Sequence, residues 1–188
     1  MPIKIYVDQG HNPENPNAGA EGNGLREQDV TYEIGRRLAL LLNANPEFEA
    51  RLSRTSPDVI LGSSTATSLS ARVDDANRWG ANYFISLHTN AADSPYANGS
   101  EAYVFSRQGE AFPFAESILT YLSYATGIRV RGVFPRPGLY VLRKTRMPAT
   151  LVELGFITNP SEANRMATDP QSFAQGIYNG ILAYFGLS

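Results

Sequence analysis

Cysteine is absent from this sequence of 188 residues, and histidine occurs only twice. The absence of cysteine excludes disulfide bridges, thiolate zinc sites, iron–sulfur clusters and cysteine nucleophiles together. A metal site built from side chains of this protein must therefore use histidine nitrogen and carboxylate oxygen as its ligands.

Excess charge and long apolar runs are also lacking. The 16 Lys and Arg against 18 Asp and Glu give a formal net charge of −2. This balance provides no broad cationic surface, so we expect no nucleic-acid partner. The longest apolar runs, Leu38 to Leu42 and Ile181 to Phe185, are far shorter than the roughly 18 residues of a membrane span. Because the first residues also lack the apolar core of a signal peptide, we expect neither a membrane span nor an export signal.

Length and apolar spacing predict the fold. A chain of this size buries roughly 70% of its unfolded surface in one core, so we expect a single domain over residues 1–188. Alternating or compact apolar runs predict strands at 3–8, 48–54, 83–87, 102–105, 139–142 and 150–154. Apolar residues at helical spacing predict helices that begin near Arg26, Leu69, Ala115, Pro160 and Pro170. This alternation predicts an α/β three-layer sandwich, with a mixed, mostly parallel sheet of about six strands and helices on both faces.

The start of the helix at Pro160 carries a capping pattern. Asn159 precedes Pro160, which suits the first helical position, and Glu162 follows shortly after. In a capping box the first side chain bonds a backbone N–H of the first turn, and a later carboxylate reaches back. We therefore expect Asn159 to cap this helix and Glu162 to reach back toward it.

Both histidines follow strands. His11 comes shortly after the run 3–8, and His88 closes the run 83–87. A single histidine at a strand end is more often a hydrogen-bonded structural residue than a ligand. The carboxyl ends of strands in open α/β sheets are, however, the usual places for ligand binding. If the two strands are neighbours, the pair can converge on one metal ion.

A carboxylate would complete such a metal site. The candidates near His11 are Asp8, Glu14, Glu21 and Glu27. Glu27 lies at the first turn of the predicted helix, where packing of Val30 and Ile34 would fix its position. The alternative role of Glu27 is to complement the positive helix N-terminus, a contribution of about 0.3 to 1 kcal/mol. The spacing alone favours neither role.

Glu153 lies inside an otherwise apolar strand, 149–156. An ionised carboxylate buried without partners is costly, so such a group is usually neutral or paired. One interpretation is a salt bridge to a nearby cation, for which the candidates are Arg143, Lys144 and Arg146. The other is a general acid and base beside a metal-bound water.

Four ordered motifs carry a resemblance to a known family. They are Asp8-Gln9-Gly10-His11, Gly24-Leu25-Arg26-Glu27, the run from Ile85 to Ala91, and the run from Leu151 to Asn159. Together they resemble the catalytic domain of the zinc-dependent N-acetylmuramoyl-L-alanine amidases of type 3, over Ile3 to about Tyr184. Gln9 departs from the family, which usually has proline there, and the loop after His11 replaces a glycine-rich turn. We expect a differently shaped cleft rim from these departures.

The resemblance implies a site and a reaction. It implies one Zn²⁺ per chain bound by His11, Glu27 and His88, with an open position for water, and Glu153 as the catalytic acid and base. It also implies hydrolysis of the amide that joins the lactyl group of muramic acid to L-alanine of the stem peptide. The partner would be peptidoglycan or a muropeptide, with the enzyme acting at the bacterial cell wall as a monomer.

Contacts to that substrate are expected from Asn90 and Arg131, although a solvated or salt-bridged Arg131 is the alternative. Aromatic residues that would line a groove are Tyr96, Tyr103, Phe134 and Tyr140, although aromatic residues at such spacings more commonly belong to the core. Without an export signal, we expect a phage endolysin, an enzyme that uses another export route, or a catalytic piece of a longer exported enzyme.

Three other functions are compatible with parts of the pattern. Two histidines and a carboxylate also form the ligand set of non-haem iron enzymes. Glu27 and Glu153 would serve as the two carboxylates of a glycosidase. A non-catalytic wall-binding protein with the same fold is the third, and it is disfavoured because His11, Glu27, His88 and Glu153 are all present.

Overall fold

The computed structural model describes residues 1–187 of the chain. The strands are β1 (Ile3–Gln9), β2 (Glu21–Gly22), β3 (Leu25–Arg26), β4 (Phe48–Leu52), β5 (Tyr83–Asn90), β6 (Ser100–Val104), β7 (Val130–Pro135) and β8 (Ala149–Phe156). The helices are α1 (Glu27–Asn43), α2 (Thr65–Trp79), α3 (Ala111–Thr126), α4 (Tyr140–Lys144), α5 (Pro160–Thr168) and α6 (Pro170–Phe185). None of these helices is long and apolar enough to cross a lipid bilayer.

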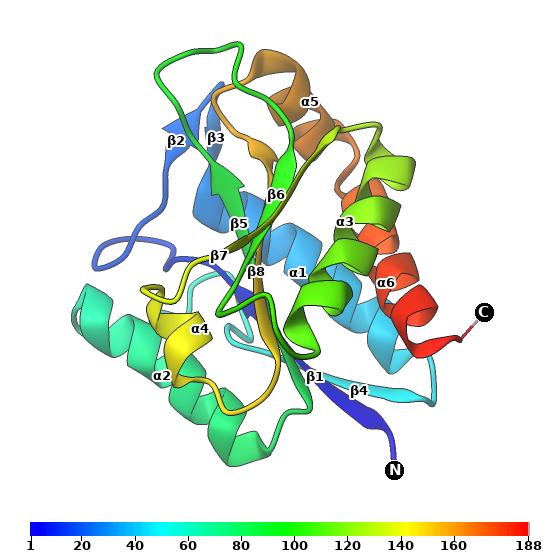
Figure 1. The fold of residues 1–188 in the computed structure, drawn as a ribbon. Coiled ribbons are helices and arrows are strands. Elements are labelled where there is room, and N and C mark those ends of the chain that lie inside the picture. Colours follow the sequence, from blue (N-terminus) through cyan, green and yellow to red (C-terminus); the bar gives the residue numbers. More distant parts are fainter. Residues whose placement is uncertain (188) are drawn as a thin grey trace.

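The main sheet has six strands in the order β4-β1-β5-β8-β6-β7 (Figure 1). Every neighbouring pair is parallel except β6 and β8, which are antiparallel. The short β2-β3 pair lies outside this sheet, directly before α1. The prediction of a mixed, mostly parallel sheet of about six strands with helices on both faces is therefore confirmed.

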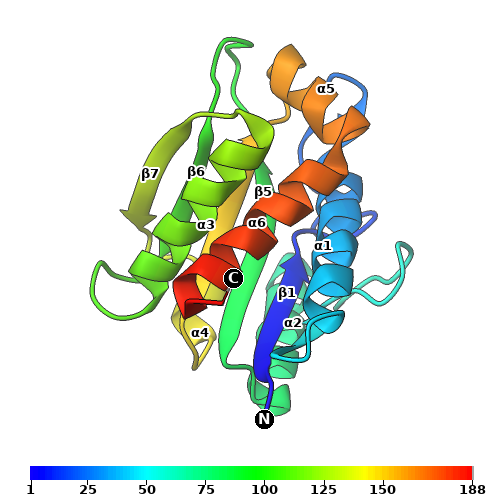
Figure 2. The ribbon, with the colours of Figure 1, turned by 90° about the vertical axis from the view of Figure 1, so that its right-hand side faces the viewer.

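One face of the sheet is covered by α1, α3 and α6 (Figure 2). Alternate strand residues such as Ile85 and Leu87 point to this side and pack against the apolar stripes of the three helices. Helices α3 and α6 approach closely because α6 carries Gly180 at the contact. A Cβ at Gly180 would lie 2.6 Å from Cα of Ile118, so only glycine permits this spacing.

The other face is covered only in part. Helices α2 and α4 pack against Tyr6, Phe84 and Leu151, which come from the earlier parts of β1, β5 and β8. In Figure 1 these two helices lie over the lower half of the sheet, away from the carboxyl end of β5. His88 and Glu153 lie further along β5 and β8 on this face, and both are partly exposed. His88 and Glu153 are therefore accessible from solvent on this face.

One predicted strand is a helix in the structure, and the edge strand β7 was not predicted. The run 139–142, which predicts a strand, instead enters helix α4, where Arg143 N donates to the carbonyl of Leu139. Four apolar residues do not distinguish a strand from one turn of helix. Strand β7 was not predicted, because it is an edge strand in which Val133 alone is fully buried and no apolar alternation arises.

The capping prediction at α5 is half correct. Asn159 caps the helix by accepting from the backbone N–H groups of Ser161 and Glu162, and Pro160 takes the first position. The carboxylate of Glu162 does not reach back. It accepts instead from the backbone N–H groups of Gly99 and Phe156, each at 2.7 Å. Glu162 therefore ties the segment before β6 to the end of β8.

Candidate metal centre and catalytic cleft

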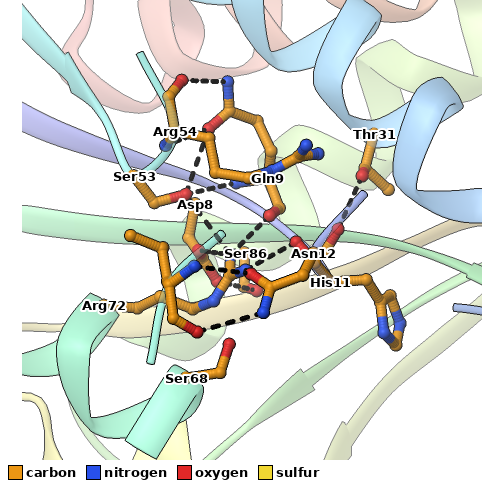
Figure 3. A network of polar contacts seen from close by, with 12 residues as sticks. Asp8, Gln9, His11, Asn12, Thr31, Ser53, Arg54, Ser68, Arg72 and Ser86 are labelled. Atoms are coloured by element: carbon orange, nitrogen blue, oxygen red, sulfur yellow. Dashed lines mark hydrogen bonds and ion pairs between the residues drawn. The ribbon is translucent and has the colours of Figure 1, made fainter. Parts of the chain in front are cut away.

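The loop that carries His11 is held from below by a buried arginine (Figure 3). The guanidinium of Arg72, which is 1% exposed, donates to the backbone carbonyls of Gln9 and His11, both at 2.5 Å. It also forms an ion pair with Asp8 at 2.6 Å. His11 has φ of 70°, a conformation that non-glycine residues rarely adopt, so this bonding is what fixes the loop. In Figure 3 the imidazole of His11 points away from the network.

Gln9 joins the end of β1 to the segment after β4. Its side-chain oxygen accepts from the hydroxyl of Ser53 and the backbone N–H of Arg54, and its amide nitrogen donates to the carbonyl of Arg54. Its backbone N–H donates to the Ser53 hydroxyl. A residue with a long amide therefore makes, at this position, contacts that proline has no groups to make.

Glu27 opens α1 and is 3% exposed. Its two oxygens accept from the backbone N–H groups of Thr89 and Ala20, both at 2.9 Å. A Cβ at Gly19 would lie 2.8 Å from one of these oxygens. The loop before α1 can therefore approach the Glu27 carboxylate this closely because residue 19 is glycine. Glu27 lies at a helix N-terminus, as both of its expected roles require, and its carboxylate faces the two histidines.

The two imidazoles and this carboxylate meet at one point. His88 Nδ1 lies 3.1 Å from Glu27 Oε1 and 3.2 Å from His11 Nε2, while His11 Nε2 lies 3.1 Å from Glu27 Oε2. The convergence follows from the topology, because β1 and β5 are parallel neighbours that pair Gln9 with Leu87. These three residues are positioned to bind a metal ion.

The donor set fits a zinc ion. Tetrahedral ligands about 2.1 Å from one ion lie about 3.4 Å apart, close to the separations found here. Burial opposes ionisation of Glu27, but hydrogen bonds and charge from His11 and His88 outweigh it and hold its pKa far below the ordinary value. The other candidate carboxylates are not in the group. Glu14 and Glu21 are exposed, and Asp8 is paired with Arg72.

Glu153 lies beside this group on β8. It pairs in register with His88 on β5 and with Glu101 on β6. Within residues 1–187 its buried Oε2 has no hydrogen-bond partner, and the expected salt bridge to Arg143, Lys144 or Arg146 is absent. Burial, and the nearby carboxylates of Glu27 and Glu101, raise the pKa of Glu153 to about 8. This group is therefore suited to exchange protons near neutral pH.

Glu101 organises the far side of the cleft. It accepts from Asn90 Nδ2 at 3.0 Å, from the Tyr103 hydroxyl at 2.5 Å and from Arg131 Nε at 2.6 Å. Although burial opposes it, these bonds lower the pKa of Glu101, so the group is anionic. Arg131 thus makes the salt bridge that was the alternative to a substrate contact. Its side chain is nevertheless 35% exposed, and its guanidinium carbon lies 5.2 Å from the ring centroid of Phe156.

Glu101 was not among the predicted site residues. The sequence signal that could have found it is the alternation within β6. Ala102 and Val104 face the core, so Glu101 and Tyr103 face the opposite side of the sheet, which carries the cleft. Of the four aromatic candidates for a groove, Tyr96 and Phe134 are exposed, whereas Tyr103 and Tyr140 are partly buried and pack against the apolar cluster under α2 and α4.

The sequence was compared with known families and proteins. A family model described as N-acetylmuramoyl-L-alanine amidase (Amidase_3) matches residues 5–183. The N-acetylmuramoyl-L-alanine amidase LytC of Bacillus subtilis is 36% identical over 96% of this chain, which spans 35% of LytC. The sporulation-specific N-acetylmuramoyl-L-alanine amidase of the same organism is 35% identical over 98% of this chain, which spans 69% of it. The endolysin of Bacillus phage SPP1 is 30% identical over 97% of this chain and 66% of its own length.

Solved structures give the same result for the fold. The catalytic domain of CwlV, an N-acetylmuramoyl-L-alanine amidase from Bacillus (Paenibacillus) polymyxa, superposes with a TM-score of 0.85, 30% identity and 99% coverage of both chains. The amidase AmiC2 of Nostoc punctiforme gives 0.84 at 32% identity and covers 98% of this chain and 97% of its own. With four ordered motifs, a shared fold and a matching family model, the chain belongs to the N-acetylmuramoyl-L-alanine amidase family of type 3.

Proposed function

We propose that this chain hydrolyses the amide between the lactyl carbonyl of N-acetylmuramic acid and the nitrogen of L-alanine, with one zinc ion held by His11, Glu27 and His88. The observation that carries the proposal is the convergence of these three side chains at the open end of the sheet, beside the unpaired carboxylate of Glu153. The names of the relatives supply the reaction. Zinc in such a site acts as a Lewis acid and lowers the pKa of a bound water toward about 7.

The protein's own contribution is a fixed set of ligands. Thr89 and Ala20 donate to Glu27 through their backbone N–H groups and leave its carboxylate directed at the imidazoles. Arg72 holds the backbone on which His11 is mounted. These contacts orient the side chains that would hold the ion.

Glu153 moves the proton. Its carboxylate takes a proton from the attacking water, whose oxygen bonds to the lactyl carbonyl carbon. The C–N bond then breaks, and Glu153 returns the proton to the departing alanine nitrogen, which leaves a muramic carboxyl group and a free amine. A carboxylate paired with a fixed cation would be a weak base, whereas Glu153 makes no ion pair among the described residues.

Asn90 and Arg131 contact the stem peptide in this proposal. Glu101 binds both side chains and so orients them toward one region of the cleft, on the Glu153 side of the metal ligands. The leaving amine must lie beside Glu153, so the peptide continues in this direction. The exposed part of the Arg131 guanidinium suits a carboxylate of the stem peptide, and Asn90 suits an amide.

The substrate is therefore peptidoglycan or a muropeptide, and the site of action is the bacterial cell wall, in keeping with the amidase and endolysin relatives. The proposed working unit is a monomer with one zinc ion. Its single site lies within one chain, on three neighbouring strands and the start of α1.

The glycosidase alternative is disfavoured by Glu27. Its two oxygens already accept from two backbone N–H groups and lie 3.1 Å from the histidine nitrogens. A glycosidase that used Glu153 as its acid would need Glu27 free to act as nucleophile or base, and these contacts already occupy both of its oxygens. Glu27 therefore suits a metal ligand.

The test combines metal analysis with identification of the products. Protein purified without added metal should contain about one zinc ion per chain, and digestion of purified peptidoglycan should release new alanine amino termini without new reducing sugars. Iron in place of zinc would favour the alternative of a non-haem iron enzyme. New reducing ends without alanine amines would favour the glycosidase, and wall binding with no soluble products would indicate a binding protein.

A further inference from the structure

A small cavity lies directly beside the metal-binding imidazoles. Its volume is ≈ 150 Å³, and His11 and His88 form part of its wall. The remaining wall is mostly apolar and comes from α2, α4 with the residue before it, and β8. These apolar lining residues are Leu69, Leu139, Tyr140, Val141 and Leu151.

Strand alternation explains where this cavity lies. Leu151 and Glu153 are two residues apart on β8 and point to the same face, as do Ser86 and His88 on β5. Leu151 packs with α2 and α4, whereas Glu153 is not part of this cluster and is partly exposed. The cavity therefore begins where the helical layer ends, immediately below the imidazoles.

The polar groups on its wall are already bonded within the protein. Asp8 is paired with Arg72 and accepts from the Ser86 hydroxyl at 2.6 Å. Asn17 donates its side-chain amide to Ser68 at 3.1 Å. No charge is thus left over to neutralise a charged ligand, and the cavity suits a small aliphatic group.

We propose that this cavity is a subsite for a methyl branch next to the scissile amide. This inference rests on the proposed function, because the amide it concerns is the one between muramic acid and alanine. Each of the two carbons that flank that amide carries a methyl group, one on the lactyl side and one on alanine. The lactyl methyl lies two bonds from the scissile carbonyl carbon and the alanine methyl three, so a carbonyl held at the imidazoles keeps both methyl groups near the cavity that His11 and His88 line.

The test compares three substrates: muramoyl-L-alanyl-D-isoglutamine, the same compound with glycine in place of alanine, and the same compound with a glycolyl in place of the lactyl group. Burial of one methyl contributes about 0.8 kcal/mol, so loss of the methyl that enters the cavity should lower kcat/KM about fourfold. The other deletion should change it less than twofold. The two arms thus distinguish the lactyl methyl from the alanine methyl.

A variant that fills the cavity provides the second arm. Leu69→Phe adds bulk from α2 and should abolish the preference for the methylated substrate, with the largest loss for the parent compound. The matched control is Leu40→Phe, because Leu40 is 59% exposed on α1, outside the cavity. This control should keep the wild-type preference. Leu69→Ala, which enlarges the cavity, should in turn accept better than wild type a substrate in which ethyl replaces the methyl that the first arm places in the cavity.

Binding supplies a readout that is independent of turnover. The same three compounds should bind to the Glu153→Gln protein with the same order of affinities, measured by calorimetry. Equal kcat/KM for all three substrates, or equal losses for all three in Leu69→Phe, would overturn the subsite and leave the amidase proposal intact. Failure of the wild-type protein to cleave any of them, or peptidoglycan, would instead overturn the amidase proposal.

Discussion

The support beneath His11 and the surroundings of Glu153 are opposite in character. Beneath His11, the buried guanidinium of Arg72 donates to Asp8, Gln9 and His11 at 2.5 to 2.6 Å. At Glu153, a buried carboxylate oxygen has no partner within the described residues. The contrast matches two tasks, because ligands must stay in place, whereas a proton carrier must change its charge without breaking a strong ion pair.

Removal of a ligand should have the largest effect. His11→Ala should lose both bound zinc and hydrolysis, to background levels, because the two remaining side chains form an incomplete site. Zinc per chain is measured by plasma mass spectrometry, alongside release of alanine amines from peptidoglycan. The matched control is Glu14→Ala, which removes an exposed carboxylate from the same loop and should retain both. A zinc-loaded, active His11→Ala protein would show that the ligand assignment is wrong.

Removal of the proton carrier should separate activity from metal binding. Glu153→Gln should keep zinc and lower kcat about 10³-fold, the scale of general acid–base catalysis. Its unfolding midpoint should be unchanged or higher, because the change removes a partly buried carboxylate that has no ion pair. The comparison uses kcat, zinc content and thermal unfolding of one preparation. Near-normal hydrolysis would exclude Glu153 as the base.

Disruption of the Arg72 network below His11 should act mainly on the free energy of unfolding. Arg72→Met leaves Asp8 buried without its cation, so the free energy of unfolding should fall by about 3 to 5 kcal/mol, measured by urea denaturation. The matched control on the same helix is Arg78→Met, whose ion pair with Asp75 is exposed and should contribute less than about 1 kcal/mol. Equal losses in the two variants would contradict the role given to the buried pair.

Asp8 determines how the stability lost in Arg72→Met depends on pH. Burial alone would raise its pKa, but Arg72 lowers it below the ordinary value of 3.8. The stabilisation from the pair is therefore present above pH 3.8 and is lost as the pH falls through the lower pKa of the folded protein. The difference in free energy of unfolding between wild type and Arg72→Met should therefore become smaller in acid. Protonation of Asp8 removes the charge that the variant leaves buried without a cation.

The smallest effect is expected on the peptide side of the cleft. Arg131→Gln should raise KM for a muropeptide about tenfold with little change in kcat, because Arg131 binds substrate and does not move protons. Arg129→Gln is the matched control, since Arg129 pairs with Asn98 at the surface and not with Glu101. A fall in kcat with constant KM in Arg131→Gln would instead place this arginine in the chemical step.

The sequence predicted the convergence of His11 and His88 well, because strand ends are local features and parallel neighbours share an edge. Glu27 needed the family motif, since helix N-terminal placement alone left two roles open. Glu101 and the support from Arg72 were not predicted. Both depend on contacts between segments far apart in the chain, 30 residues for Glu101 with Arg131 and 64 for Arg72 with Asp8, and no local pattern specifies such partners.

Crystals of the protein grown with zinc test the central claim most directly, by anomalous scattering on the two sides of the zinc absorption edge. The account predicts one strong peak per chain, bounded by His11 Nε2, His88 Nδ1 and the carboxylate of Glu27, and its loss in crystals of His88→Ala. An active wild-type protein whose zinc peak lies elsewhere, or does not involve these three side chains, would contradict it.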